Sequence, residues 1–533
     1  MHPPPIRITQ VVMADVSSSF SEAKDAMHCA RQAFHAWSRC HPAVRLQCLR
    51  ALREAIATQS EQIVADIVAD TGKPPLDALG GDLLVTLELI RYYERTATAA
   101  LKPERIARSP IFFAGTRFEE YLEPYGVALI FGPSNYPFQL SMIPAITALV
   151  AGNAVVLKVS ERTPRTAARI SSLFAQNFPA GLVHVINTTP EESSAYLDAI
   201  PDIIFMTGST AAGRLIARKA AEQLIPVVLE LGGKDAALVF ADAHLERTLD
   251  GIAFGGFSNG GQVCVGIKRL YVEQPVYGVI LAGLAERLGK LRGGSTKDHD
   301  FGPLVGEQTR IRFRRQIGDA VARGAKLEYG SMDKIDGDDP VMLSGVPADA
   351  LLLREESFGP VLCIDKFEGE QQAIELVEDS SFGLAASIWT RDLKRAKRIA
   401  KQINVGSCSI NDVIQQVANP VAAFGGNKHS GFGRYHGSHG LRAFSKVKTV
   451  MIARGAKKRE THWFPFSAKT YRQLQAIMQL RHGARSGWLK ALKGLFTALF
   501  LICLTGHAPA QSTQLEISVI LPSNGQQGSG IDN

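Results

Sequence analysis

Short apolar runs alternate with helical stretches in the second quarter of the chain, and this alternation constrains the fold more than any other feature. The runs cover residues 127–131, 154–157, 183–186 and 203–205, and helical stretches are predicted between them. Apolar strands separated by helices are typical of a parallel sheet covered on both faces. The sequence therefore predicts a doubly wound α/β domain, which binds its ligands at the carboxyl ends of the strands.

A glycine-rich turn follows the fourth apolar run. It contains Gly208, Ser209 and Gly213, and a helix is predicted to begin there. Glycine lets the backbone approach a phosphate, and a helix N-terminus offers free N–H groups to it. The Gly-x-Gly-x-x-Gly fingerprint of dinucleotide-binding turns is absent. The turn is therefore either a phosphate site or a plain connection.

A carboxylate and a cysteine lie close together in the sequence, each beside a pair of glycines. Glu230 ends an apolar run just before a Gly-Gly break, and Cys264 follows a second Gly-Gly pair. A thiolate can attack an electrophilic carbon, and a carboxylate can activate the water that releases the acyl group. The pair indicates covalent catalysis, and the small residues around Cys264 leave room for a substrate and a cofactor.

The motifs around these two residues resemble those of the NAD(P)-dependent aldehyde dehydrogenases. Leu-Glu-Leu-Gly-Gly-Lys at 229–234, Asn-x-Gly-Gln-x-Cys at 259–264 and their separation match that family's catalytic signatures. The resemblance extends from about residue 20 to residue 465. Asn-Tyr-Pro-Phe at 135–138 and Gly-Arg-Tyr-His-Gly at 433–437 are most similar to the branch that acts on medium- and long-chain or aromatic aldehydes.

The resemblance implies oxidation of an aldehyde to a carboxylic acid. Cys264 is expected to form a thiohemiacetal with the carbonyl and then a thioester, which water activated by Glu230 hydrolyses. The Asn135 side-chain amide and the Cys264 backbone N–H are expected to stabilise the oxyanion, an effect of about 3 kcal/mol per donor. Capping of the next helix is the alternative role for Asn135.

The resemblance also implies a nicotinamide cofactor at the strand ends. Ser209 is expected near its pyrophosphate, with Gly208 and Gly213 in the same turn. Lys158 and Glu161 are expected to hold the adenosine ribose hydroxyls, whereas a solvated turn is their alternative role. A carboxylate at Glu161 would repel a 2′-phosphate, so NAD is predicted in preference to NADP, which is the second candidate.

A third part of the cofactor site is implied near residue 356. By resemblance, Glu356 is expected to hold the nicotinamide ribose, and Phe358 is expected to pack beside the ring. The alternative is that the following Gly-Pro is simply a turn into the strand predicted over 361–364.

Three other classes of function stay open. An acylating dehydrogenase would transfer the acyl group to coenzyme A. Glu230 argues against it, because a base that activates water would hydrolyse the thioester. A non-catalytic, membrane-tethered family member would keep only the fold, and the joint presence of Cys264, Glu230 and Asn135 argues against that. A cysteine hydrolase would need a histidine partner, and no histidine motif pairs with Cys264.

Composition limits the remaining possibilities. The length of 533 residues predicts two domains with appendages. The seven cysteines have no Cys-x-x-Cys spacing, so no metal site and no disulfide framework is predicted. The net charge of +8 is modest and no arginine block is interleaved with aromatics, so no nucleic-acid partner is expected. The N-terminus lacks the apolar core of a secretory signal, and a cytoplasmic location is predicted.

The motifs divide the chain into predicted domains. A Rossmann-like NAD-binding domain is expected to comprise residues 1–117 and 127–229, and an α/β catalytic domain residues 230–435. Strands at 118–126 and 440–455 are expected to form a small β bridging element. In the family the corresponding ribbon joins subunits, so a homodimer is predicted.

The residues from 460 to 533 form a basic, partly apolar extension that departs from the family pattern. Its uncharged stretch, 494–505, is shorter than the roughly 20 residues that span a bilayer. Nearby basic residues would suit an anionic membrane surface. Residues 485–505 are therefore predicted either to contact a membrane or to form a packed amphipathic helix. A membrane-facing extension would suit an apolar long-chain, aromatic or isoprenoid aldehyde.

Overall fold

The computed structural model describes residues 16–107, 113, 115–294, 299–335, 337–455, 458–460 and 462–483. The chain divides into two compact units between Ile452 and Ala453. The first unit holds two large sheets and their helices, and the described part of the second contains helix α18 (Ala468–His482).

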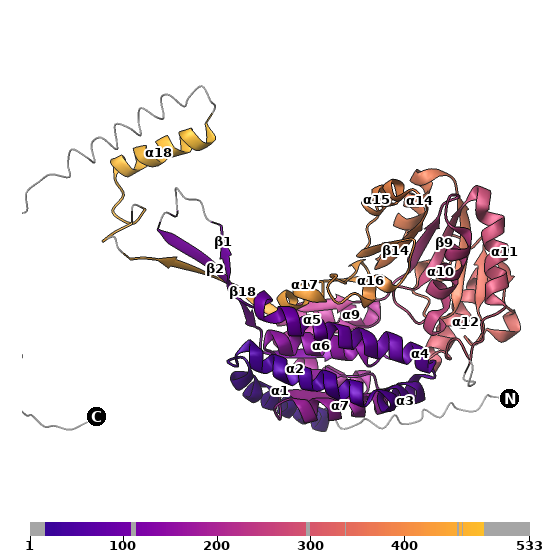
Figure 1. Ribbon diagram of the computed structural model, residues 1–533, viewed down its shortest axis with the longest axis horizontal. Coiled ribbons are helices and arrows are strands. Elements are labelled where there is room, and N and C mark those ends of the chain that lie inside the picture. The colour runs from indigo at the N-terminus through magenta and orange to yellow at the C-terminus, as the bar shows by residue number, and fades with distance from the viewer. Residues whose placement is uncertain are drawn as a thin grey trace, which may run out of the picture. The chain divides into compact units, whose positions relative to one another are not determined.

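A layer of helices precedes the first large sheet. Its members are α1 (Val16–Trp37), α2 (Pro42–Thr58), α3 (Ser60–Thr71), α4 (Pro75–Asp77), the π-helical segment η1 (Ala78–Leu84) and α5 (Val85–Ala100). The first two helices are separate because Pro42 begins α2, a position that proline favours. Gly72 ends α3 with a φ of 69°, which only glycine adopts readily. The labels α2 and α5 in Figure 1 mark neighbouring helices of this layer.

The first large sheet has six strands in the order β17-β7-β6-β3-β4-β5. The strands are β3 (Val127–Phe131), β4 (Ala154–Lys158), β5 (Val183–Ile186), β6 (Ile203–Thr207), β7 (Val227–Glu230) and β17 (Gly431–Phe432). All are parallel except β17, which is antiparallel to β7. The chain starts in the middle at β3, winds outward to β5 and then crosses back to β6 and β7. This order confirms the predicted doubly wound, Rossmann-like fold.

Helices connect the strands of this sheet and cover it. They are α6 (Gln139–Ala151), α7 (Pro164–Asn177), α8 (Pro190–Asp198) and α9 (Thr210–Glu222). Every residue of α6 is buried, which agrees with its nearly continuous apolar sequence. The core of this region also includes Phe424, Tyr435 and Phe444. Residues 424–435, which the sequence assigned to the catalytic domain, therefore pack with the first sheet.

The second large sheet has seven strands in the order β10-β11-β12-β9-β8-β14-β15. The strands are β8 (Asp235–Val239), β9 (Ile267–Glu273), β10 (Lys326–Tyr329), β11 (Val341–Ser344), β12 (Val361–Phe367), β14 (Ala385–Trp389) and β15 (Ser407–Ile410). Only β10 is antiparallel to its neighbour. Successive residues of β8 pack into different cores, Ala237 and Val239 into one and Ala236 and Leu238 into the other. Both faces of this sheet are therefore covered.

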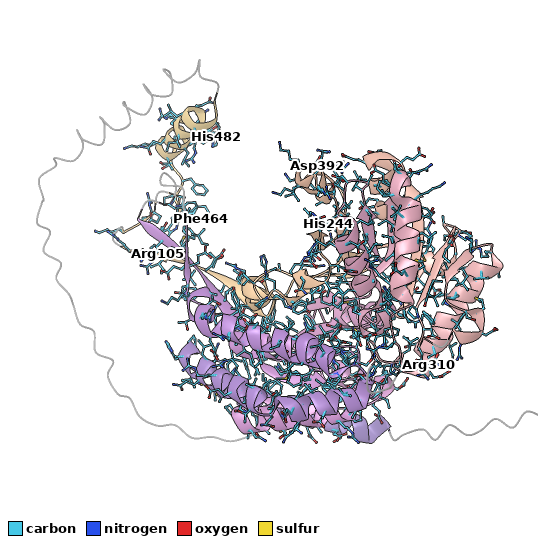
Figure 2. The ribbon with its side chains drawn as sticks, turned by 45° about the vertical axis from the view of Figure 1, so that its right-hand side comes forward. Arg105, His244, Arg310, Asp392, Phe464 and His482 are labelled. Carbon is cyan, nitrogen blue, oxygen red and sulfur yellow. The ribbon has the colours of Figure 1, made fainter. Side chains whose placement is uncertain are left out.

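Helices flank the second sheet, and shorter elements complete the unit. The helices are α10 (Leu245–Phe257), α11 (Tyr277–Leu288), α12 (Glu307–Ala322), α14 (Gly369–Glu378) and α15 (Leu393–Ala400). The short elements are η2 (Ser258–Gly261), η3 (Gln274–Val276), η4 (Met332–Lys334), α13 (Leu351–Arg354), β13 (Phe382–Gly383), α16 (Gln415–Ala418), β16 (Asn427–Lys428) and α17 (Gly437–Ala443). Polar side chains cap two of these helices, His244 before α10 and Asp392 before α15 (Figure 2).

A three-stranded sheet contains β1 (Glu104–Ile106), β2 (Thr116–Pro124) and β18 (Ser445–Ala453), in that order. The strands predicted at 118–126 and 440–455 therefore lie side by side, as β2 and β18. Most of β18 is exposed. Its role in joining subunits stays a prediction.

In the second unit, α18 lies within the extension predicted over 460–533. Among the described residues, no helix is both long enough and apolar enough to cross a membrane. Residues 485–505, for which a membrane contact was predicted, lie outside the described part of the chain.

Candidate active site

The two large sheets meet where β7 ends and β8 begins. Glu230 is the last residue of β7, at the carboxyl edge of the first sheet, and Asp235 opens β8 at the amino edge of the second. Cys264 lies three residues before β9, the neighbour of β8. A Cβ atom added to Gly233 would lie 2.3 Å from the Cys264 carbonyl oxygen. The topology therefore brings the predicted base and the predicted nucleophile to one junction.

The loop before Cys264 has a backbone that few sequences can adopt. Asn259, Gly260 and Gly261 have successive φ values of 51°, 62° and 68°. Only glycine, and to a lesser degree asparagine, adopts this region readily. A Cβ atom on Gly261 would lie 2.1 Å from the Gly359 carbonyl oxygen. The Asn-Gly-Gly sequence is thus required for two reasons: the backbone has positive φ values there, and no space is left for a side chain at Gly261.

The Cys264 thiol is partly exposed at this junction. Burial raises its pKa above the ordinary value, and the negative charges of Asp235, Glu356 and Glu230 raise it further. The thiol form is therefore favoured by the protein alone. Since the thiolate is the nucleophile, Cys264 has to lose its proton before it can attack a carbonyl carbon.

Glu230 is 3% exposed. Within the described part of the chain, neither of its carboxylate oxygens has a hydrogen-bond partner. Burial raises the pKa of Glu230 well above its ordinary value, and the charge of Arg434 opposes this effect. Arg434 itself donates to the carbonyls of Gly426 and Gly433. A carboxylate without a protein donor is free to accept a proton from a water molecule.

Asn135 lies in the loop after β3 and is buried. Its side-chain Nδ2 donates to the Gln262 carbonyl at 2.9 Å, two residues before Cys264. The N-cap of α6 is Phe138, so the alternative role of Asn135 as the cap of this helix is wrong. Gln262 supports the loop, because its Nε2 donates to the Asn259 carbonyl and its Oε1 accepts from the Val305 N–H.

The residues predicted for the adenosine ribose lie at the end of β4. Lys158 Nζ lies 2.7 Å from Glu161 Oε2. Burial alone would raise the pKa of Glu161, but the hydrogen bond from Lys158 and the charges of Lys158 and Arg162 lower it below its ordinary value. The two predicted residues therefore form a pair with an ionised carboxylate.

The predicted phosphate turn lies at the end of β6, next to the crevice between β3 and β6 where the winding of the sheet reverses. The Ser209 hydroxyl accepts from the Ala212 N–H and caps α9. The Gly208 N–H donates to the Glu230 carbonyl at 3.0 Å. Gly213 packs against Leu231, because a Cβ atom there would lie 2.5 Å from a Leu231 methyl carbon. The Thr207 hydroxyl is buried with no partner among the described residues. These features fit a dinucleotide at the helix N-terminus.

Glu356 reaches the junction from the loop before β12. A Cβ atom on Gly232 would lie 2.3 Å from its carboxyl carbon. Burial raises the pKa of Glu356, and a hydrogen bond from the Gly233 backbone opposes that shift. The next residue, Ser357, accepts a hydrogen bond from Lys234 Nζ at 2.6 Å. Phe358 is partly buried in the same loop.

Comparison with known proteins decides the family. The family model described as "Aldehyde dehydrogenase family" matches residues 5–450. This chain belongs to the aldehyde dehydrogenase family. It therefore catalyses oxidation of an aldehyde, and the expectations that it is an NAD-dependent enzyme with this fold are confirmed.

Three relatives illustrate the match. The chain is 38% identical over 458 residues to 4,4′-diapolycopene aldehyde oxidase of a Methylomonas species, covering 86% of each protein. It is 29% identical over 428 residues to 4,4′-diaponeurosporen-aldehyde dehydrogenase of Staphylococcus aureus, covering 80% of this chain and 92% of the relative. The solved NAD⁺ complex of an aldehyde dehydrogenase from Bacillus cereus has a TM-score of 0.77 and 31% identity, covering 82% of this chain and 89% of that one.

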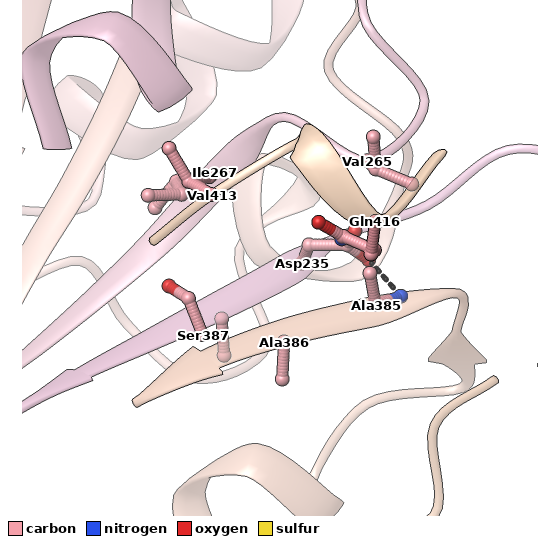
Figure 3. A pocket seen from close by; sticks show the side chains of 9 residues that line it. Asp235, Val265, Ile267, Ala385, Ala386, Ser387, Val413 and Gln416 are labelled. Carbon is pink, nitrogen blue, oxygen red and sulfur yellow. Dashed lines mark hydrogen bonds between the residues drawn. The ribbon is translucent and has the colours of Figure 1, made fainter. Parts of the chain in front are cut away.

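The sequence did not single out several buried charged residues around the active site of this dehydrogenase. Lys268 Nζ donates to the carbonyls of Gly261 at 2.8 Å and Gly359 at 2.9 Å, and burial lowers its pKa to about 7. Asp235 Oδ1 accepts from the Ala385 N–H at 3.0 Å, beside a small pocket between β8 and β14 (Figure 3). Burial raises the pKa of Asp235 well above its ordinary value. A charged residue at the second position of the strand β9 was the available signal for Lys268.

Proposed function

We propose that this aldehyde dehydrogenase oxidises apolar aldehydes to carboxylic acids through a thioester on Cys264 that is hydrolysed by water. The observation that carries the proposal is the pairing at the sheet junction. Within the described part of the chain, Glu230 is buried with no hydrogen bond to its carboxylate, and it lies close enough to the partly buried Cys264 for the two groups to interact electrostatically. A base and a nucleophile placed together in this way can divide one difficult step into two easier ones.

In the first half of the proposed reaction, the Cys264 sulfur bonds to the aldehyde carbon and gives a thiohemiacetal. The Asn135 amide and the Cys264 backbone N–H donate to the oxyanion, each effect being about 3 kcal/mol. Lys158, Glu161, Ser209 and Glu356 would hold NAD, which when bound would accept the hydride that leaves the thiohemiacetal carbon as the carbonyl re-forms and the thioester results. Phe358 would pack beside the nicotinamide, and Gly208 and Gly213 would let the backbone approach the phosphates.

In the second half, the Glu230 carboxylate takes a proton from water, and the water oxygen bonds to the thioester carbon. The carbon–sulfur bond then breaks and the acid leaves. An acylating enzyme would instead pass the acyl group to coenzyme A. The unpartnered carboxylate of Glu230 supports hydrolysis, because it provides a water base at the thioester.

The test follows NADH formation by absorbance with NAD and decanal. Wild type is expected to turn over steadily, Cys264→Ala to lose turnover, and Glu230→Gln to give a single burst. Turnover that survives Cys264→Ala would overturn the assignment of the nucleophile. Turnover that appears only after coenzyme A is added would establish the acylating alternative.

The proposed substrates are long, apolar isoprenoid aldehydes. Two relatives are named for 4,4′-diapolycopene aldehyde and for 4,4′-diaponeurosporen-aldehyde. A further relative, 32% identical over 460 residues, is named vanillin dehydrogenase, so an aromatic aldehyde is the second candidate. The discriminating measurement is kcat/KM for farnesal, decanal and vanillin. A higher value for vanillin than for farnesal would reject the isoprenoid proposal.

We also propose a cytoplasmic homodimer joined through residues 118–126 and 440–455. The exposed strand β18 supports this, because a sheet edge with exposed residues can pair with a second chain. The proposed domains are 1–117 with 127–229, 230–435 and the extension 460–533, except that residues 424–435 pack with the first sheet. Sedimentation tests the dimer, and recovery of all protein in the high-speed supernatant would reject a membrane contact through 485–505.

A further inference from the structure

Two buried charged residues of the helical layer contact the loop that carries Asn135. Lys73 and Asp82 are both fully buried, and Lys73 Nζ lies 3.1 Å from Asp82 Oδ2. Lys73 Nζ also donates to the main-chain carbonyl of Asn135 at 2.7 Å. The ion pair therefore touches the backbone of the proposed oxyanion donor, although it lies in a different part of the sequence.

Asp82 holds the far end of the same loop. Its Oδ1 accepts from the N–H groups of Phe138 and Gln139, both at 3.1 Å. These amides lie at the start of α6, where a helix has N–H groups without intrahelical partners. A carboxylate there also interacts favourably with the helix dipole. Lys73 and Asp82 together fix the loop at both ends.

The local backbone is shaped to place Asp82. Asp82 lies in the π-helical segment η1 between α4 and α5, and such segments are rare and frequent at functional sites. Gly81 in the same segment packs against Tyr136, since a Cβ atom there would lie 2.5 Å from the Tyr136 ring. Lys73 Nζ lies 3.8 Å from the centroid of that ring. Tyr136 directly follows Asn135, so the residues on both sides of the peptide bond that joins them are held by contacts with Lys73 or Gly81.

The Asn135 carbonyl has a second donor. Asn259 Nδ2, from the loop before Cys264, donates to it at 3.0 Å. A carbonyl oxygen has two acceptor positions, so Lys73 and Asn259 together use both. Replacing a buried ion pair by apolar residues of similar volume is often neutral for stability. The contacts of Lys73 and Asp82 with the Asn135 loop therefore point to a role beyond stability.

We propose that Lys73 and Asp82 are positioning residues for acylation of Cys264. They orient the Asn135 peptide so that its side-chain amide meets the oxyanion of the thiohemiacetal. The inference rests on the proposed function of Asn135 as the oxyanion donor. Neither residue touches the substrate. A misplacement of about 1 Å in such a site can reduce the rate about 10²-fold.

The test measures the rate of the NADH burst by stopped flow, with NAD and decanal. The variants are Asn135→Ala, Lys73→Met and the double variant. Asn135→Ala is expected to slow the burst about 10²-fold, and Lys73→Met at least about tenfold. The double variant is expected to be no slower than Asn135→Ala, because Lys73 acts only through Asn135.

Arg53→Met provides a matched control. Arg53 Nε lies 2.9 Å from Glu94 Oε1 in the same helical layer, between α2 and α5. Its loss is expected to lower the melting temperature without slowing the burst. If Lys73→Met does not fold, Asn259→Gly removes the other donor to Asn135 and tolerates the φ of 51°. Asn259→Gly is expected to slow the burst in wild type and to cause no further slowing when Asn135 is alanine.

The outcomes separate two failures. If Lys73→Met leaves the burst rate unchanged, the positioning role is overturned. It is also overturned if Lys73→Met slows the burst by the same factor in the Asn135→Ala background as in wild type. If Asn259→Gly is used in place of Lys73→Met, the same result overturns the positioning role as well. If Asn135→Ala leaves the burst unchanged while Cys264→Ala abolishes it, the proposed oxyanion role of Asn135 fails instead.

Discussion

Lys158 Nζ lies 2.7 Å from Glu161 Oε2 at the end of β4, so the predicted ribose-binding carboxylate already has a cation beside it. Arg162 lies 3.7 Å from the same carboxylate. The carboxylate of Glu161 is ionised between two positive groups. The net charge at the predicted ribose site therefore depends strongly on the carboxylate of Glu161.

Replacing Glu161 is expected to shift the cofactor preference toward NADP. Glu161→Gln removes the negative charge and leaves Lys158 and Arg162 to attract a 2′-phosphate. The ratio of kcat/KM for NADP to that for NAD is expected to rise on the order of tenfold, which corresponds to about 1.4 kcal/mol. Glu191→Gln, an exposed acid in α8, is the control and is expected to leave the ratio unchanged. An unchanged ratio in Glu161→Gln would contradict the assignment.

The pH dependence of deacylation is expected to follow Glu230. The carboxylate has to be ionised to accept a proton from water, and burial raises its pKa well above the ordinary value. The rate of thioester hydrolysis is therefore expected to rise with pH, with its midpoint well above the usual range of a glutamate. Multiple-turnover and burst kinetics across pH measure this. A rate that is already maximal near pH 5 would argue against Glu230 as the base.

The same shift predicts a change in stability. Between the ordinary and the raised pKa of Glu230, the folded state binds more protons than the unfolded state, so stability falls as pH rises through this window. Glu230→Gln cannot ionise and escapes this loss. Its free energy of unfolding relative to wild type is expected to increase with pH, by about 1.4 kcal/mol per pH unit within the window. Denaturant unfolding of both proteins at several pH values tests the sign.

The Cys264 thiol is expected to react slowly with iodoacetamide in the absence of cofactor. Burial and the charges of Asp235, Glu356 and Glu230 raise its pKa, so little thiolate exists near neutral pH. The alkylation rate is expected to increase with pH and to increase several-fold in Glu356→Gln, which lacks one of these charges. Mass spectrometry of the peptide that contains Cys264 measures it, with the buried Cys363 as an internal reference. Rapid alkylation at pH 6 would be inconsistent with this environment.

Alanine at Gly261 is expected to destabilise the fold and abolish activity. The φ of 68° disfavours alanine, and the new Cβ atom would lie 2.1 Å from the Gly359 carbonyl oxygen. The loss of stability is expected to exceed about 2 kcal/mol. Gly278→Ala, in α11 with no atom within 4 Å of the added Cβ, is expected to stabilise by about 0.5–1 kcal/mol. Thermal unfolding compares the two, and equal effects would contradict the argument.

Local sequence patterns predicted much of the fold and the reactive pair. Three of the four apolar runs became the buried strands β3, β4 and β6, because buried parallel strands need continuous apolar sequence, and the fourth became the edge strand β5, which contains His184 and is only half-buried. The positions of Glu230 and Cys264 followed from short motifs around each residue. The contribution of Lys73 was not predictable, because its partner Asn135 is 62 residues away and the contact depends on the π-helical turn that places Asp82. The sequence around Lys73, a lysine followed by two prolines, does not indicate that this side chain is buried.

The backbone of Glu230 is held on every side. It pairs with Thr207 of β6 and with Gly431 of β17, and its carbonyl accepts from the Gly208 N–H. Its carboxylate, in contrast, has no hydrogen bond from the described residues. Any change in the position of this base during turnover is therefore confined to rotation about its side-chain bonds, over an immobile main chain. Alternation between a resting and an active orientation then requires no opening of the sheet, and its speed is set by a rotamer jump rather than by a domain motion.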